Sequence, residues 1–426
     1  MDKKPLFYGW IVVAALWVAY FLNMGFPLYA GSVINSYMIK EISMDRATYG
    51  MGFTLINLCT GGLAVFVGFA VARFGVRKTM WFGCALNMLG ALVLAFWASA
   101  PWHYLLGFGI LMGTGESFAC VVPSTTTCMR WFTRFRGRAI AIVLTASAFG
   151  GFVGAPLFNK LLATNGGDWR QAWLIVAAGI ALTMVIIYLF VKERPEEIGA
   201  IPDGGAGPAA VQADANSAIR TTYDWQPKEV FRTSAFWLVL VGSIACKIPF
   251  FFFTAHGILH AKGAGISAAD AAMIMGLFTL GGIPGRLIGG WLMDKIPGRF
   301  VFMMGLCCYI AGDFIDIFMT GQTALAYIAS LLIGAGFGWT FVAVNTIPGQ
   351  YFGPKAFSKV NGTYLTLSGA ISSPIGALGG YFYDLYHSYV VSFSFCIAVC
   401  IVGILALAFA RMPKPPAQKV KEAIGI

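Results

Sequence analysis

Long apolar runs alternate with short polar connections along almost the whole chain. A membrane-spanning helix needs about 20 mostly apolar residues, because each residue rises about 1.5 Å. Lipid offers no partners to backbone N–H and C=O groups, so each run is expected to be a helix. Twelve runs meet this requirement, and they lie at approximately 9–37, 48–72, 79–99, 102–130, 138–163, 170–191, 235–260, 269–293, 300–319, 324–348, 357–384 and 388–411.

One connection is much longer than the others. It extends from about 192 to 234, contains the letters GGAGP at 204–208, and shows little apolar periodicity. Such a composition is typical of a flexible linker. The first apolar run is too long for a cleavable signal peptide. The sequence therefore predicts four segments: a six-helix bundle at 1–191, a cytoplasmic linker at 192–234, a second six-helix bundle at 235–411, and a cytoplasmic tail at 412–426.

The basic residues predict the orientation. With both termini in the cytoplasm, 22 of the 29 lysines and arginines fall on the cytoplasmic side and five on the opposite side. Two more, Lys247 and Arg286, lie inside predicted spans. Cytoplasmic loops of membrane proteins carry this excess of positive charge. Topology therefore accounts for the net charge of +11, and we expect no nucleic-acid partner.

Composition excludes several classes of protein. Charged residues make up 11% of the chain, against about 25% in soluble domains. The nine cysteines lie in apolar runs without CxxC spacing, which argues against a disulfide framework or a zinc site. We find no Walker loop, no GxSxG turn and no His/Glu metal helix. The expectation is a multi-pass protein of the inner or plasma membrane that contacts lipid, is not an enzyme, and needs no metal or cofactor.

Two loop motifs repeat at nearly constant spacing. The letters GFAVARFGVRK begin at residue 68 and GWLMDKIPGR begins at residue 290, which is 222 residues later. The letters RWF at 130–132 correspond to QYF at 350–352, which is 220 residues later. Two markers at nearly one spacing support a parallel repeat of two six-helix halves, as in many secondary transporters.

The first of these motifs resembles the G-x-x-x-D-R-x-G-R/K loop of the major facilitator superfamily. The resemblance implies an all-α membrane protein with twelve transmembrane helices, arranged as two six-helix bundles related by a pseudo-two-fold axis, with both termini cytoplasmic. It also implies that the loops latch a cytoplasmic gate, although Ala72 stands where an aspartate is usual. The residues expected at this gate are Arg73, Gly75, Arg136, Asp294 and Arg299.

Shorter motifs resemble a narrower group, the monocarboxylate transporter family and its bacterial relatives such as the oxalate–formate antiporters. They are YGW at 8–10, RGRA at 136–139, GGFVGAP at 150–156, PEEIGAIPDG at 195–204, RTSAFW at 232–237 and His256 ahead of GIS at 265–267. This resemblance implies the transport of small organic anions.

Ionisable residues at bilayer depth usually mark a pathway or a pair. Arg286 follows the letters GGIPG at 281–285, and its guanidinium can hold a carboxylate with two parallel hydrogen bonds. By the resemblance, Arg286 occupies the helix-8 arginine position that is assigned to the substrate carboxylate. The alternative is a structural salt bridge to Glu116 or Asp313.

The resemblance also places a proton-coupling aspartate four residues before that arginine, where this chain has Gly282. Glu116 could replace it, because a glutamate in a dry cavity can carry a proton near neutral pH. Alternatively, Glu116 is permanently paired with Lys247 or Arg286. His256 matches a family position near the outer end of helix 7, where it either relays protons or caps the helix at the headgroup level.

Other polar residues of the spans leave two interpretations open. Lys247 is either a second anion ligand or the partner of Glu116. Asn23, Trp339 and Tyr364 either line the cavity or hydrogen-bond between helices. Asp313 and Asp316 share one helix face, which favours an interfacial position or structural pairing. Four phenylalanines at 250–253 cover every face of their helix, so at least one ring should reach the cavity.

The predicted function is secondary active transport of small organic anions by alternating access. Proton-coupled symport of a monocarboxylate such as lactate or pyruvate is the first hypothesis, with Arg286 as ligand and Glu116 as proton carrier. A second hypothesis is the exchange of a dicarboxylate or another organic anion, held by Lys247 and Arg286 together. A non-transporting anion sensor and a structural membrane oligomer are the remaining alternatives.

Overall fold

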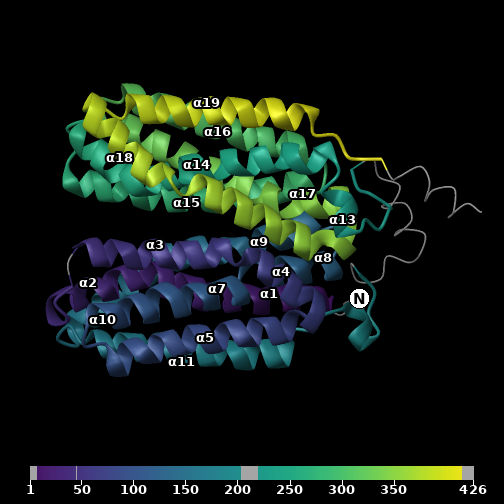
Figure 1. Cartoon of the computed structure of the whole chain (residues 1–426), viewed down its shortest axis with the longest axis horizontal. Helices are drawn as coiled ribbons and strands as arrows, with labels where there is room; N and C mark the ends of the chain where they lie inside the picture. The colour runs from purple at the N-terminus through teal and green to yellow at the C-terminus, as the bar shows by residue number, and fades with distance from the viewer. Residues whose placement is uncertain (1–6, 45, 203–218, 415–426) are drawn as a thin grey trace, which may run out of the picture.

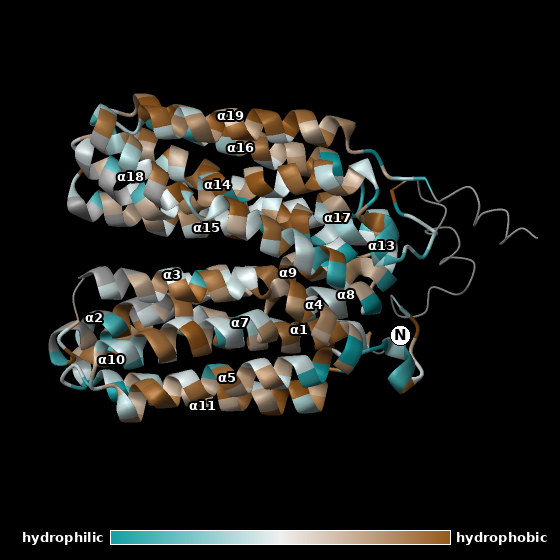
Figure 2. Ribbon diagram, in the orientation of Figure 1, coloured by the Kyte–Doolittle hydropathy of each residue, from teal (hydrophilic) through white to brown (hydrophobic). Residues whose placement is uncertain are grey.

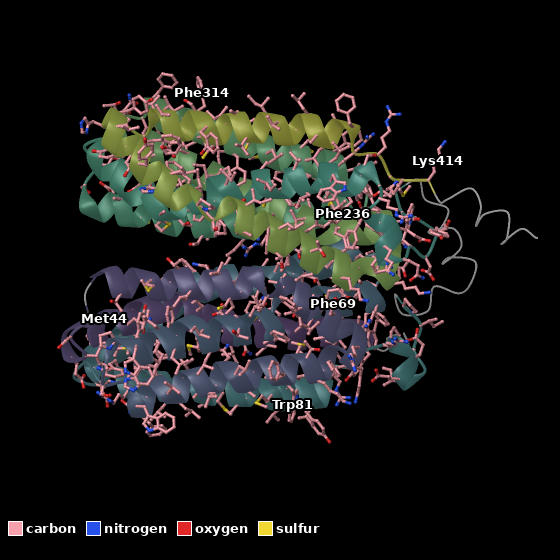
Figure 3. All side chains as sticks on the ribbon, in the orientation of Figure 1. Met44, Phe69, Trp81, Phe236, Phe314 and Lys414 are labelled. Carbon is pink, nitrogen blue, oxygen red and sulfur yellow. The ribbon has the colours of Figure 1, made fainter. Side chains whose placement is uncertain are left out.

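The computed structural model describes residues 7–44, 46–202 and 219–414, and these residues form helices and connections without any strand (Figure 1). Parts of two predicted segments, 203–218 of the linker and 415–426 of the tail, lie outside the described residues. The described chain ends, Phe7 and Lys414, lie at the same end of the molecule as α13 (Figures 1 and 3). We call this end the termini side, and the opposite end the far side.

Helices of the first 190 residues lie together in one half of the molecule (Figure 1). The first run is continuous, because α1 passes through a π-helical segment, η1, into α2. The elements of this half are α1 (Tyr8–Tyr20), η1 (Phe21–Ala30), α2 (Gly31–Glu41), α3 (Arg46–Gly62), α4 (Ala64–Phe74), α5 (Val76–Trp97), α6 (Pro101–Tyr104), η2 (Leu105–Met112), α7 (Gly113–Ala119), α8 (Val121–Trp131), α9 (Arg136–Phe149), η3 (Gly150–Gly154), α10 (Ala155–Thr164) and α11 (Trp169–Phe190).

The second half follows two short connecting helices on the termini side. Its longest helix, α17, is interrupted at Gly353, whose φ of 72° and ψ of 176° are not helical. The two connecting helices are η4 (Pro195–Ile198) and α13 (Pro227–Val230). The elements of the second half are α14 (Ser234–Gly263), α15 (Ala268–Met293), α16 (Gly298–Phe318), α17 (Thr323–Ser372), α18 (Ile375–Tyr386) and α19 (Val390–Phe409).

Large apolar side chains cover the outer surface. Trp97, Phe318 and Phe409 are 68%, 61% and 74% exposed. Trp81 and Phe314 project from opposite outer faces (Figure 3). Apolar residues dominate the outer helices α5, α11 and α19, and hydrophilic residues gather at the ends of the molecule (Figure 2). An exposed apolar surface of this extent is expected of a protein surrounded by lipid.

The described residues include ten helices that are long and apolar enough to cross a membrane. The pair α3 and α4, bent by 44°, adds an eleventh if it forms one span. One of the ten is the interrupted α17, which the sequence divides into two predicted spans. The helical membrane fold is confirmed, whereas the number of twelve spans and the cytoplasmic position of the termini stay predictions.

Two seams join the halves on the termini side. In the first, α9 packs on α15, and a Cβ atom at Gly290 would lie 2.7 Å from the backbone oxygen of Gly137. In the second, α4 packs on α17, and a Cβ atom at Gly68 would lie 2.5 Å from the backbone oxygen of Ser358. Gly68 and Gly290 are the first residues of the repeated motif, and only glycine permits either contact.

Candidate functional site

A cavity of about 150 Å³ lies between the two halves. The first half contributes oxygen-bearing side chains to its wall, among them Asn57, Thr60 and Glu116. The second half contributes both cations, Lys247 and Arg286. The second half also provides all the phenylalanines of the described lining, which are Phe250, Phe251, Phe337 and Phe341. The two walls therefore differ in chemistry, since the first half contributes the acidic side chain and the second half contributes the cations and the phenylalanines.

A larger cavity of about 660 Å³ adjoins the first. The two share part of their lining, including Asn57, Lys247 and Phe251. The second cavity is bordered by residues nearer the far side, such as Thr254 of α14 and Pro374 after α17. The central cavity therefore continues toward the far side, while the glycine seams hold the halves together on the termini side.

The guanidinium of Arg286 is buried at the wall of the central cavity. The residue is 3% exposed, and its Cζ lies 5.6 Å from the ring centre of Phe337. Nη1 donates to the backbone oxygen of Leu144 at 2.8 Å and to the hydroxyl of Ser147 at 3.2 Å. Both acceptors belong to α9 of the other half. Arg286 thus faces the cavity and also ties the two halves together.

Glu116 and Lys247 reach the same cavity without forming an ion pair. Glu116 is 1% exposed, and its Oε2 accepts a hydrogen bond from Thr60 at 3.3 Å. Lys247 donates from Nζ to the backbone oxygen of Leu365 at 3.0 Å. Among the described residues, no salt bridge joins Glu116 to Lys247 or to Arg286. The permanent pairing considered from the sequence is therefore not present in this conformation.

The structure places four further predicted residues outside the central cavity. Asn23 receives hydrogen bonds from Asn87 on α5 and donates to the backbone of its own helix. Tyr364 donates to the backbone oxygen of Phe236 and stacks on its ring, with centres 4.7 Å apart. Trp339 packs against Gly289 on α15. These residues join helices to one another in this conformation.

His256, the fourth of these residues, lies toward the far side. Its Nε2 is 2.7 Å from the backbone oxygen of Gly376, and its Nδ1 is 3.3 Å from the hydroxyl of Tyr389. Gly376 borders the larger cavity. The histidine therefore connects α14 to α18 and α19 at the edge of that cavity.

Asp294, one of the predicted gate residues, forms the centre of a group of contacts between the halves on the termini side. It follows α15 in the second half, and its carboxylate accepts hydrogen bonds from the backbone N–H of Gly137 at 2.8 Å and of Arg138 at 3.2 Å. These are among the first N–H groups of α9, whose own N-cap residue, Phe135, provides no side-chain bond. A helix N-terminus attracts such a negative group. Asp294 therefore caps a helix of the opposite half.

Two cations and burial act on the same carboxylate. The side chains of Arg138 and Arg220 approach Asp294 at 3.4 and 3.7 Å. Burial raises the pKa of Asp294 to about 6, and this effect outweighs the backbone bonds and the two arginines, which lower the pKa. Asp294 lies just past the apolar span of α15, so a change in pH on the termini side can reach it.

In the described part of the chain, the first copy of the motif has no carboxylate that bonds to the opposite half as Asp294 does. Arg73 is exposed and lies over the ring of Phe74. Gly75 has a φ of +88° and packs against the carboxylate of Glu193, which also accepts from the backbone N–H of Arg77 at 3.1 Å. These contacts remain within one half. Across the seam, Lys359 lies over the ring of Phe69, with Nζ 4.9 Å from its centre.

The last two predicted gate residues bond within their own halves. Arg136 donates to the backbone oxygen of Phe132 at 2.6 Å. Arg299 donates to the backbone oxygen of Ala408 at 3.1 Å. The neighbours of Arg136, rather than its own side chain, reach Asp294 across the seam.

Sequence reasoning missed Arg138, Arg220 and Glu193. Arg138 and Arg220 pair with Asp294, and Glu193 pairs with Arg130 at 3.5 Å. A signal for Arg138 was present, because it stands within the basic letters RFRGR at 134–138. Arg220 belongs to the predicted linker, where composition gave no sign of a contact with Asp294.

Asp313 and Asp316 correct one expectation. Both are buried in α16, at 0% and 3% exposure. Neither side chain forms an ion pair within the described part of the chain, and both carboxylate oxygens of Asp313 lack hydrogen-bond partners there. The predicted structural pairing of these aspartates is therefore not observed.

Known proteins with similar sequences are membrane transporters. An uncharacterised MFS-type transporter from Bacillus subtilis, YcxA, is 25% identical, and the match covers 95% of this chain and 97% of the relative. Monocarboxylate transporter 13 of Bos taurus is 25% identical over 93% of this chain and 88% of its own length. Monocarboxylate transporter 11 of Mus musculus is 26% identical, with 93% and 86% covered.

Two solved structures share the fold. A proton:xylose symporter, XylE, matches with a TM-score of 0.75 and 14% identity over 94% of this chain and 95% of that one. The Escherichia coli fucose:proton symporter FucP matches with a TM-score of 0.69 and 13% identity, with 93% and 98% covered. A family model of the Major Facilitator Superfamily matches residues 16–377. This match and the all-helical architecture establish that the chain is a multi-pass cell-membrane transporter of the Major Facilitator Superfamily and not an enzyme.

Proposed function

We propose that the protein carries a small monocarboxylate of the lactate or pyruvate type, together with a proton, across the cell membrane. Arg286 carries this proposal, because it is a buried arginine at the wall of a cavity between the two halves. A guanidinium stays charged at any working pH and holds a carboxylate bidentately. Two of the relatives are monocarboxylate transporters by name, which supports the same substrate class.

The proposed topology has twelve spans and cytoplasmic termini. It counts α3 and α4 as one bent span and α17 as two, divided at Gly353. The distribution of basic residues supports this orientation. On this basis the cavity faces the outside, and the gate at Asp294 closes the cytoplasmic side. Transport then requires the halves at 1–191 and 235–411 to rock about the central cavity, connected by the linker at 192–234 and followed by the tail at 412–426.

The order of binding follows from the lining of the two cavities. Lys247 borders both, so an anion entering from the far side meets Lys247 before Arg286. Arg286 has five N–H donors, and its bonds to Leu144 and Ser147 use one nitrogen. We propose that the guanidinium donates hydrogen bonds to the carboxylate while its Nη1 still holds α9.

Glu116 is the proposed proton carrier. A carboxylate buried without a cationic partner is strongly disfavoured, and no such partner contacts Glu116 among the described residues. A proton on Glu116 removes the negative charge that would repel the entering anion, which favours binding of the substrate and closure around it. His256, at the edge of the larger cavity, is the proposed relay from the far side.

A second candidate function is the exchange of dicarboxylates. The position of Lys247 on both cavities favours it, since Lys247 and Arg286 could each hold one carboxylate. Competition of labelled lactate uptake by unlabelled mono- and dicarboxylates distinguishes the two functions.

The decisive experiment is uptake of labelled lactate into proteoliposomes, with and without an inward proton gradient. The wild type should show gradient-driven uptake. Arg286→Lys keeps the charge but loses the two-pronged geometry, so uptake should fall at least tenfold. Glu116→Gln should abolish the effect of the gradient while lactate still exchanges across the membrane. Gradient-driven uptake that survives Glu116→Gln would show that the proton is carried elsewhere.

A further inference from the structure

The aromatic wall of the central cavity narrows the substrate class, and this inference rests on the proposed function. Phe250 and Phe337 stack with ring centres 3.9 Å apart and planes inclined by 17°. Phe341 continues the column, 5.2 Å from Phe337 and inclined by 25°. The three rings come from α14 and α17 and border the cavity together. The cavity therefore presents a rigid aromatic column rather than scattered apolar side chains.

Arg286 lies against this column. Its Cζ is 5.6 Å from the ring centre of Phe337 and 5.8 Å from that of Phe341. A carboxylate held by the guanidinium therefore brings its attached carbon atoms alongside these rings. Aromatic pairs prefer offset-stacked or edge-to-face contacts, and an aliphatic group of equal size gains neither. The position of the charge thus selects for a ring directly attached to the carboxylate.

The volume of the cavity agrees with a single ring. An apolar cavity of about 150 Å³ in another protein admits benzene. The central cavity has the same volume, about 150 Å³. Met24 and Leu28 of the first half also border it and add to its apolar lining. A lactate-sized acid fits here but leaves this apolar wall largely uncovered.

The opposite wall disfavours a second carboxylate. Glu116 and the hydroxyls of Thr60 and Ser117 supply oxygen atoms there. A dicarboxylate whose first carboxylate is held by Arg286 would direct its second carboxylate at these oxygen atoms. Of the two cations, Lys247 also borders the larger cavity, whereas Arg286 borders only the central one of these two cavities. The central cavity is therefore matched to one anionic group and one apolar body.

We infer that the substrate is a monocarboxylate whose body is a single flat apolar ring, with the size and shape of benzoate. The carboxylate pairs with Arg286, and the ring lies beside Phe250, Phe337 and Phe341. Smaller aliphatic acids use the same arginine and bind more weakly. Aromatic contacts of this kind change affinity by about three- to tenfold.

Titration calorimetry on the purified full-length protein tests this inference with four acids. Benzoate and cyclohexanecarboxylate have equal numbers of carbon atoms but differ in planarity, lactate lacks the ring, and terephthalate adds a second carboxylate. Benzoate should bind three- to tenfold more tightly than cyclohexanecarboxylate, and more tightly than lactate or terephthalate. Phe337→Leu should remove the preference for benzoate while changing lactate affinity less than twofold. Phe314→Leu, the same change on the outer face of α16, should alter neither.

The remaining outcomes distinguish failure of this inference from failure of the proposed function. Equal or tighter binding of lactate or cyclohexanecarboxylate, with all acids weakened by Arg286→Lys, overturns the aromatic substrate and leaves the monocarboxylate function intact. Tighter binding of terephthalate also overturns it, in favour of the dicarboxylate alternative. Absence of binding by every acid, in protein that unfolds cooperatively on heating, overturns the proposed function together with the inference.

Discussion

Replacing Asp294 with alanine should open the gate on the termini side. The carboxylate accepts two backbone N–H groups of α9 and faces Arg138 and Arg220. Loss of a helix cap costs up to about 2 kcal/mol, which is about 30-fold in an equilibrium constant. At pH 5, where the closed state holds this carboxyl group mostly protonated and burial penalises no charge, the ratio of open to closed molecules should therefore rise by up to about 30-fold. Asp294→Asn keeps one oxygen acceptor and is uncharged like the protonated aspartate, so it should stay about as closed as the wild type is at pH 5.

The same carboxylate predicts a pH dependence of definite sign. In the closed state its pKa is about 6, while an exposed aspartate has an ordinary value of 3.8. The closed state therefore binds the proton more tightly, so acid favours closure, and the closed state loses this advantage as the pH rises toward about 6. From pH 5 to pH 7.5, the ratio of open to closed molecules should increase about tenfold. Asp294→Asn should abolish this dependence.

A thiol at position 358 can report the opening. Ser358 is 6% exposed and packs at the seam beside Gly68, so Ser358→Cys should react with an impermeant maleimide only when the gate opens. The accessible native cysteines Cys59, Cys307 and Cys308 are first replaced by serine. The labelling rate at each pH is divided by the labelling rate of the denatured protein at the same pH. This division corrects for the change of thiol reactivity with pH.

The matched control is Asp224→Ala, which removes an exposed carboxylate on the same side. It should leave the labelling rate unchanged. If Asp294→Ala labels no faster than Asp224→Ala, and the wild-type rate does not change with pH, the reasoning on the gate is refuted.

Three further predictions concern stability, each measured as the melting temperature of the purified protein. Gly353→Ala should destabilise by about 1–3 kcal/mol, because a side chain is strained at this φ of 72° and ψ of 176°. Asp313→Asn should leave the melting temperature unchanged or raise it, because the carboxylate has no partner among the described residues to lose, and a large decrease would reveal one. Gly150→Ala should lower it, since the added Cβ would meet the backbone of Gly25, whereas Gly276→Ala, in open space, should not.

The sequence predicted the membrane fold well because its signal is additive over many residues. A run of about 20 apolar residues identifies a helix whatever its neighbours are. The motif glycines at 68 and 290 and the acid at Asp294 were also recognisable, since their role depends on the local loop. Each of these features lies in the chain itself rather than in contacts between distant segments.

The cavity residues were harder to predict because a polar residue does not reveal its partner. Tyr364 bonds to the backbone of Phe236, which lies 128 residues earlier, and this contact depends on how α14 packs on α17. Asn23 is similarly occupied by Asn87. By contrast, Arg286, Lys247 and Glu116 do border the cavity, because a charge in a membrane span has few other stable positions.

The aromatic side of the cavity was predicted only in part. The run at 250–253 was expected to bring at least one ring to the cavity, and Phe250 and Phe251 lie there. Phe337 and Phe341 carried no distinguishing signal, since phenylalanines spaced by four residues occur on any buried helix face. The stacked column depends on the relative position of two helices, which the pattern of either helix alone does not contain.

The two seams differ in the kind of contact that holds them, so they should respond differently to the ionic strength of the solution. One seam includes a buried carboxylate and two arginines, while the other includes glycine packing, a lysine over a ring and uncharged hydrogen bonds between Thr366 and the backbone of Gly61 and Val65. Ionic strength screens the partly exposed charges of the first and hardly affects the close contacts of the second. Added salt should therefore weaken the seam at Asp294 more than the seam at Gly68, so that separation of the halves begins at the first seam and then reaches the second.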